Sequence, residues 1–286
     1  MDALQNIRND FNSYRQIVEL YNKHKDTMFE TIEVSIRQWF SANISAALGS
    51  VVDLLQSNLN TVQFVVMDSS IENILSKNGF LSHYGNFTNK KDNWHTTIPY
   101  QKLKPTDGTF FKKYVYLELL QREELPQMSL PAREAIAEGI YEIFVNSQMH
   151  SQTDRIYTCG QFFPTKNKIE FTIVDTGIGF KNRINQHFNK QLSATQAITW
   201  AVKDRHTTKT DTPGGIGLAK LSEFIKLNKG KLQIISNEGF YELSSSGEIT
   251  NKFTQEFPGT IVNLQFRTND DKSYKLKEEI DLNDIF

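Results

Sequence analysis

Cysteine is nearly absent from this sequence, and long apolar runs are absent altogether. The 286 residues include one cysteine, Cys159, which excludes an intramolecular disulfide and a zinc site built from several cysteines. The longest apolar stretches, such as residues 64–67, are far shorter than the roughly 20 residues that a membrane span needs. The chain does not open with a basic stretch and an apolar segment, so we expect a soluble, cytoplasmic protein with no membrane partner.

The sequence also lacks an excess of charge of either sign. It has 32 Lys and Arg residues against 33 Asp and Glu residues, which gives a formal net charge of -1. This balance argues against a strongly basic nucleic-acid binder, although it leaves room for a local basic patch. Aromatic residues are plentiful: 20 Phe, 10 Tyr and 3 Trp are enough to help fill a sizeable core.

The first part of the chain has the pattern of a small α/β unit. Apolar spacing predicts four elements in turn: a helix at 3–25, a strand at 31–36, a helix at 40–58 and a buried strand at 62–67. A strand, a helix and a second strand in succession favour a parallel pair. We expect this unit to occupy residues 1–125, with a boundary near 122–130.

The second part predicts a larger α/β domain over residues 126–268, followed by a loose, charged tail at 269–286. A long helix should start after Ser129, a good N-cap, and end near His150. Its further elements begin with strands at 155–163 and 168–174 and a polar segment at 180–213, which contains a short helix near 194–203 capped by Ser193. A helix at 216–227 and strands at 231–236, 239–243, 248–253 and 259–266 follow.

Four short patterns in this part have residue types suited to phosphate, metal or base recognition. They are Glu142, Asn146 and His150 on the long helix; Asp175, Gly177 and Gly179 after a strand; Gly214, Gly215, Gly217 and Leu218 before a helix; and Gly259 with Thr260 in the last strand. Alone, each also fits an ordinary feature, such as a solvated helix face, a turn, a flexible loop or a plain strand. The Walker A signature is absent, and the dinucleotide fingerprint fails because its third glycine is Asn182 and no helix is expected there.

In this order, the four patterns resemble the motifs of the GHKL ATPase superfamily, which includes gyrase and the histidine kinases. The resemblance covers about residues 130–268. It implies a Bergerat-type fold, which is a two-layer α/β sandwich with a mixed sheet, and it implies ATP and Mg²⁺ as ligands. One departure is Met149, where histidine kinases often have a lysine three residues after the asparagine.

The resemblance assigns roles to individual residues. Asn146 matches the residue whose side-chain oxygen holds Mg²⁺ against the phosphates, and Mg²⁺ favours such oxygen ligands. Glu142 matches the residue that activates the attacking water in the hydrolysing branches. Asp175 matches the carboxylate that accepts a hydrogen bond from the adenine amino group, and Thr260 matches the threonine that supports it, directly or through water.

The glycines and the polar segment complete the expected nucleotide site. Gly177 and Gly179 should free a lid at 180–213, which we expect to be mobile without nucleotide because it has few apolar anchors. The phosphates should be contacted from the lid and from the start of the next helix by Thr208, Lys209, Gly215, Gly217 and Leu218.

Three functions follow from this resemblance. The first is a Mg·ATP-dependent switch with slow hydrolysis, in which lid closure controls a protein partner and drives homodimerisation, with the helix at 3–25 as the pairing element. The second is a serine kinase of the anti-sigma-factor type that acts on a STAS-like partner. The third is an interaction module that binds ATP without chemistry. The 1–125 unit itself loosely resembles a STAS domain, and Ser69 or Ser70 would then be an acceptor or simply cap the next turn.

Overall fold

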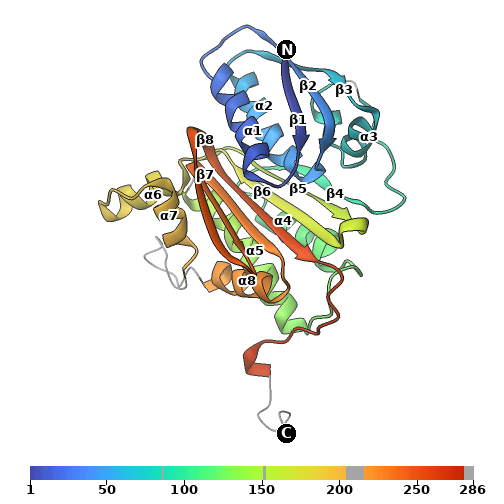
Figure 1. Ribbon diagram of the computed structural model, residues 1–286, viewed down its shortest axis with the longest axis vertical. Coiled ribbons are helices and arrows are strands. Elements are labelled where there is room, and N and C mark those ends of the chain that lie inside the picture. The colour runs from blue at the N-terminus through green and yellow to red at the C-terminus, as the bar shows by residue number, and fades with distance from the viewer. Residues whose placement is uncertain (86, 151–152, 204–215, 280–286) are drawn as a thin grey trace.

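The computed structural model describes residues 1–85, 87–150, 153–203 and 216–279. Two β-sheets and their helices form an α/β architecture, as expected (Figure 1). Helices α1 (Phe11–His24) and α2 (Ser45–Ser57) lie between the two sheets. In the described part of the chain, no helix is both long and apolar enough to cross a membrane.

The first sheet has three parallel strands in the order β1 (Asp2–Ile7), β2 (Thr31–Phe40) and β3 (Thr61–Met67). The parallel pairing of β2 and β3 is confirmed. The expected helix at 3–25 is wrong at its start, because residues 2–7 pair with β2 instead. The helix begins after Asp10, whose side chain accepts a hydrogen bond from the Ser13 N–H at 2.8 Å.

One hydrophobic core joins this unit to the nearer face of the second sheet. Tyr14, Ile17 and Val18 of α1 are buried in it, together with Phe240 and Phe257 of the second sheet. The apolar face of α1 is therefore used inside the chain, which argues against this helix as the pairing element of a homodimer. Short elements complete the unit: η1 (Ala42–Ile44), α3 (Ser69–Lys77) and η2 (Leu81–His83).

The second sheet has five strands in the order β4-β5-β6-β8-β7: β4 (Thr97–Leu103), β5 (Ile156–Phe163), β6 (Lys168–Asp175), β8 (Gly247–Arg267) and β7 (Lys231–Ser244). All of its pairings are antiparallel, so the expected mixed sheet is wrong. The four expected strands over 231–266 are two long ones, whose register shifts at Asn237. Strand β4 belongs to this sheet although it precedes the expected boundary near 122–130.

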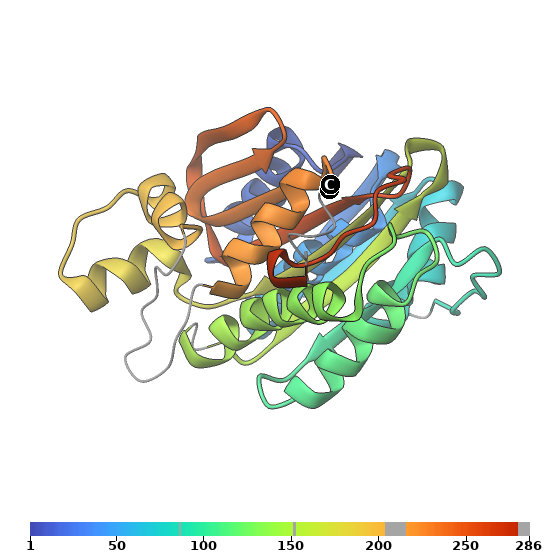
Figure 2. The same ribbon diagram turned by 90° about the horizontal axis from the view of Figure 1, so that it is seen from below.

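Helices cover the other face of the second sheet and enclose a second core. They are α4 (Gly108–Val115), the π-helical turn η3 (Tyr116–Leu120), α5 (Leu130–His150) and α8 (Ile216–Leu227). Helices α5 and α8 pack side by side, as Figure 2 shows from below. The Ser129 Oγ accepts a hydrogen bond from the Ala132 N–H at 3.2 Å, which confirms the predicted N-cap.

The described part of the C-terminal tail is not loose. Tyr274 is buried against Phe224, and its backbone carbonyl accepts a hydrogen bond from the Ser129 N–H at 2.9 Å. In the turn η5 (Lys277–Glu279), the Glu279 carboxylate accepts a hydrogen bond from the Ser129 Oγ at 2.7 Å. These contacts tie the tail to the start of α5.

The segment expected to be a polar lid contains two helices. Helix α6 (Gly179–Phe188) begins at Gly179, so the expectation that no helix comes there is wrong. Helix α7 (Ala194–Ala201) has the expected Ser193 cap, which forms a complete capping box with Gln196. Both helices pack against β7, and Ile184 and Ile198 are buried, so residues 180–203 have more apolar anchors than the sequence suggested.

Candidate functional site

Helix α5 crosses the second sheet where β6 ends, and it connects two of the sequence patterns. Glu142 and Asn146 are one turn apart on α5, and both are partly buried. Ser147, the residue after Asn146, donates a hydrogen bond from its Oγ to the Asp175 Oδ2 at 2.9 Å. The end of β6 is thereby fastened to the stripe of α5 that was expected to hold the metal and the water.

Asp175 is a charged residue with a buried side chain at this contact between α5 and β6. Its side chain lies at the end of β6 and the residue is only 6% exposed. Besides the Ser147 Oγ, the Gly177 N–H donates to the Asp175 Oδ1 at 2.9 Å. Both donors are neutral, and each carboxylate oxygen can accept one more hydrogen bond.

Burial has a clear effect on the ionisation of this carboxylate. It raises the pKa of Asp175 from 3.8 to about 6, and the two hydrogen bonds from Gly177 and Ser147 offset part of that rise. A carboxyl group buried at a strand end with a strongly shifted pKa is a functional-site candidate on physical grounds.

Asp175 begins a row of buried polar side chains that runs across three strands. It lies directly opposite Thr260 of β8, and Thr260 lies opposite Ser236 of β7, so all three side chains share one face of the sheet. The Thr260 Oγ1 and the Ser236 Oγ are 3.1 Å apart and hydrogen-bonded. Thr260 is therefore beside Asp175, as expected, while the hydroxyl bonded to the carboxylate is that of Ser147.

Two glycines in the predicted patterns are required by close contacts. Gly259 has φ +134°, and a Cβ there would lie 2.0 Å from the backbone oxygen of Asp175. Gly179 has φ +74°, and a Cβ there would lie 2.4 Å from the Asn237 Oδ1. Gly259 thus lets the backbone of β8 pass close to the end of β6. Gly179 likewise lets the start of α6 pass close to Asn237, where the register of β7 shifts.

The start of α6 is capped by side chains from β7. The Ser236 Oγ accepts from the Phe180 N–H at 2.8 Å, and the Asn237 Oδ1 accepts from the Lys181 N–H at 3.2 Å. These bonds satisfy N–H groups that a helix start leaves unpaired. Gly179 therefore begins a helix whose first N–H groups are bonded to β7, at the position where the sequence predicted freedom for a lid.

Glu142 contacts the glycine-rich helix start. Its Oε2 accepts a hydrogen bond from the backbone N–H of Leu218, in the first turn of α8, at 3.3 Å. The Leu218 side chain is buried in the core. A carboxylate thus occupies a helix N-terminus, the kind of place that also attracts phosphate.

Four of the predicted residues lie outside the described part of the chain: Thr208, Lys209, Gly214 and Gly215. Gly217 lies in α8.

The sequence analysis missed three residues of the candidate site: Ser147, Ser236 and Asn237. One feature of the sequence pointed to Ser147, because it is a small polar residue beside the apolar stripe of α5. Nothing pointed to Ser236 and Asn237, because single serines and asparagines are ordinary in strands.

Neither a comparison with models of protein families nor a search of curated proteins finds a match for this chain. The function proposed below therefore rests on the contacts of these residues and on the resemblance of the four patterns.

Proposed function

We propose that this chain is a Mg·ATP-binding switch protein with slow ATP hydrolysis. The observation that supports it most is the buried Asp175 carboxylate, which accepts hydrogen bonds from two neutral donors and has lone pairs left to accept another. The adenine amino group is such a donor, and guanine presents a carbonyl oxygen at the same place. Asp175 would accept this hydrogen bond and thereby select adenine.

The side chains of α5 fit the phosphate end of the same ligand. Asn146 supplies a neutral oxygen one turn from Glu142 and beside Ser147, which bonds to Asp175. The described residues have no cluster of three His, Cys, Asp or Glu side chains that could hold a metal. Asn146 would serve as one oxygen ligand of a magnesium ion whose other ligands are phosphates and water. When bound, ATP supplies the phosphoryl group to be cleaved, and Mg²⁺ neutralises part of the phosphate charge.

Glu142 has a defined part in this proposal. Its carboxylate accepts the Leu218 N–H, in the first turn of α8. A phosphate group would compete with it for that helix terminus, because both are anions attracted to free N–H groups. The displaced carboxylate would then orient and deprotonate a water molecule. Exchange of a carboxylate for a phosphate would thus couple nucleotide binding to activation of the base.

A radiolabelling experiment separates the proposed hydrolysis from its alternatives. The purified chain is incubated with ATP labelled on the γ-phosphate, with Mg²⁺, alone and with candidate STAS-like proteins. Release of free phosphate that is lost in Glu142→Ala supports the ATPase. Label transferred to a serine of the partner supports the anti-sigma-factor type of kinase instead. Binding of ATP with neither product leaves an interaction module without chemistry.

A further inference from the structure

Four cations gather at the end of the second sheet where a short turn joins β5 to β6. Lys168 of β6 lies directly opposite Arg267 of β8, so the two side chains share one face of the sheet. Strands β1 and β2 run towards the second sheet and end against it (Figure 1). The Lys166 ammonium and the Arg8 guanidinium lie 5.0 Å and 5.4 Å from the centre of the Trp39 ring at the end of β2. Arg8, Lys166, Lys168 and Arg267 form what we call the basic patch.

The basic patch has little compensating negative charge. Among the described residues, the carboxylate that pairs with it is that of Glu170, which is buried and bound to Lys168. Arg8 and Arg267 donate to neutral oxygens, and no carboxylate of the described chain pairs with Lys166. Partial burial lowers the pKa of Lys166, and so do the nearby charges of Arg8 and Lys168. Cations that repel one another in this way bind an anion favourably, because the anion offsets their repulsion.

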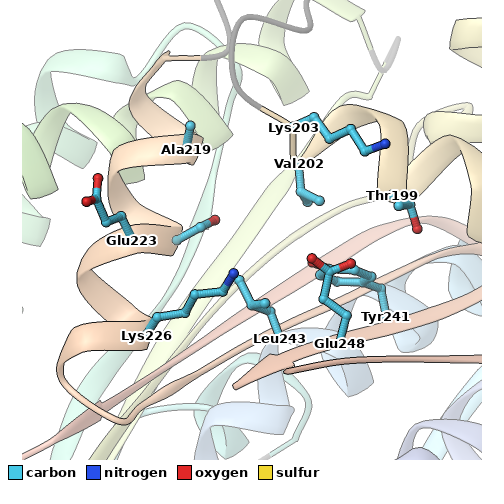
Figure 3. A pocket seen from close by; sticks show the side chains of 10 residues that line it. Thr199, Val202, Lys203, Ala219, Glu223, Lys226, Tyr241, Leu243 and Glu248 are labelled. Carbon is cyan, nitrogen blue, oxygen red and sulfur yellow. The ribbon is translucent and has the colours of Figure 1, made fainter. Parts of the chain in front are cut away.

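A hollow on another part of the surface provides a contrast. It has a volume of about 280 Å³ and lies between α7, α8 and the paired strands β7 and β8 (Figure 3). Two lysines and two glutamates line it: Lys203, Lys226, Glu223 and Glu248. Its charges balance, whereas the basic patch has four cations beside one paired carboxylate. Of the two surfaces, the basic patch is the one that selects anions.

The loop before β4 presents an exposed tryptophan. Trp94, at the tip of this loop, is 80% exposed. Hydrogen bonds hold both sides of the tip: the Asp92 carboxylate accepts from the Thr97 N–H at 2.7 Å, and Arg122 donates to the His95 carbonyl. The loop therefore keeps the indole in the solvent, although burial of so large an apolar group would be favourable. A ring presented in this way has an open face for a stacking partner.

Trp94 and the basic patch form one row along the end of the second sheet. The strand order is β4-β5-β6-β8, and the loop joins the sheet where the Phe162 N–H of β5 donates to the Thr96 carbonyl at 2.9 Å. Neighbouring strands are about 4.8 Å apart, so the row from Trp94 to Arg267 spans about 14 Å. This length suits a few nucleotides of an extended single strand.

We propose that this row binds a short segment of single-stranded nucleic acid. The phosphates pair with the basic patch, and a base stacks on Trp94. Sites for single strands combine these two elements, a positively charged track and an aromatic platform, and they tolerate many sequences. An anionic lipid surface fits less well, because the basic patch has no protruding apolar side chain to insert. Phe163 is buried there, and Trp39 is partly buried beneath two cations.

The test is fluorescence anisotropy of labelled oligo(dT) and oligo(U) of about 12 nucleotides, titrated with the full chain without ATP. Saturable binding of both is expected. Three or four phosphate contacts predict that the affinity falls about 20- to 50-fold between about 50 and 200 mM salt. Failure to bind either single strand, tighter binding of a duplex of the same length, or binding only of phosphatidylserine vesicles would overturn the proposal.

Variants of exposed residues locate the bound strand. Lys166→Glu is expected to raise the Kd about tenfold or more, and Trp94→Ala about tenfold, the scale of one stacked base. Lys252→Glu makes the same charge change towards the other end of β8 and should change the Kd less than about twofold. ATP affinity should stay unchanged in all three variants, because none alters a residue assigned to the nucleotide site. Wild-type affinity in both Lys166→Glu and Trp94→Ala, with folding verified by urea unfolding, or an equal loss in Lys252→Glu, would refute the proposal.

Discussion

Replacing Asp175 by asparagine should stabilise the fold while weakening ATP binding. The carboxyl pKa is 3.8 ordinarily and about 6 in the folded protein. One pKa unit corresponds to about 1.4 kcal/mol, so keeping this group ionised in the fold costs about 3 kcal/mol at neutral pH. Asparagine is neutral, and its amide can still accept from the Gly177 N–H and donate to the Ser147 Oγ. We therefore expect Asp175→Asn to raise the free energy of unfolding by up to about 3 kcal/mol without nucleotide.

The sign of the pH dependence follows from the raised pKa. A carboxyl group with a higher pKa in the folded than in the unfolded state binds its proton more tightly in the folded state. The contribution of Asp175 to the free energy of unfolding of the wild type is therefore fully present below about pH 3.8. It is lost as the pH rises to about 6. The gain from Asp175→Asn should appear above pH 6 and vanish towards pH 4.

The affinity for ATP should change in the opposite direction. In Asp175→Asn, an amide NH₂ group, which donates hydrogen bonds, replaces one carboxylate oxygen, which accepts them. The adenine amino group therefore loses a charge-assisted partner. We expect binding weaker by about 1 to 3 kcal/mol at pH 7.5. Protonation of Asp175 has a similar effect, so wild-type affinity should fall as the pH drops through about 6.

Urea unfolding at several pH values and calorimetric ATP titration measure the two effects. Glu19→Gln is the matched control, because Glu19 is an exposed carboxylate on α1 and should change neither quantity. Destabilisation of Asp175→Asn at every pH would refute the reasoning about the buried charge. A more stable variant with wild-type ATP affinity would keep that reasoning and refute the adenine role.

Three further predictions concern single residues. Glu142→Ala should leave ATP bound and slow phosphate release by roughly 100-fold, the usual scale for a general base; unchanged release would make Glu142 a structural cap of α8. Gly259→Ala should lower the free energy of unfolding in urea by about 2 to 5 kcal/mol, because φ is positive there and a Cβ would lie 2.0 Å from a backbone oxygen. Gly247 also has a positive φ but faces open space, so Gly247→Ala should cost about 1 to 3 kcal/mol. Equal losses for the two glycines would contradict that difference. Asn43→Ala should cost about 2 to 4 kcal/mol, since Asn43 is fully buried and its amide bonds three side chains from separate segments. Asn58→Ala should cost less than about 1 kcal/mol, because Asn58 is only partly buried and its amide donates to one backbone carbonyl, that of Lys25.

Local signals in the sequence predicted those parts of the fold that local physics decides. Ser129 and Ser193 were identified as helix caps because an N-cap needs only a short side chain at the right position, and both caps are present. The strand β1 was missed because Leu4 and Ile7 continue the helical apolar spacing of α1, and only pairing with β2 draws them into a sheet. Helix α6 was missed because its caps, Ser236 and Asn237, lie on a distant strand.

The candidate site shows the same division between local and long-range information. The sequence placed Asp175 at a strand end and Thr260 in the last strand, and the antiparallel register sets them opposite each other. It also predicted Glu142 and the start of α8 as parts of one site, and the two are in contact. The partner of Asp175 could not be predicted, because the contact of Ser147 depends on how α5 crosses β6.

The most direct test of the central proposal is the magnesium dependence of ATP binding in the wild type and in Asn146→Ala, measured by calorimetry at pH 7.5. We predict saturable binding of ATP by the wild type, preferred over GTP and strengthened by Mg²⁺. In Asn146→Ala, ATP should still bind through Asp175, with an affinity nearly independent of Mg²⁺. Failure of the wild type to bind ATP, or equal strengthening by Mg²⁺ in both proteins, would contradict the proposal.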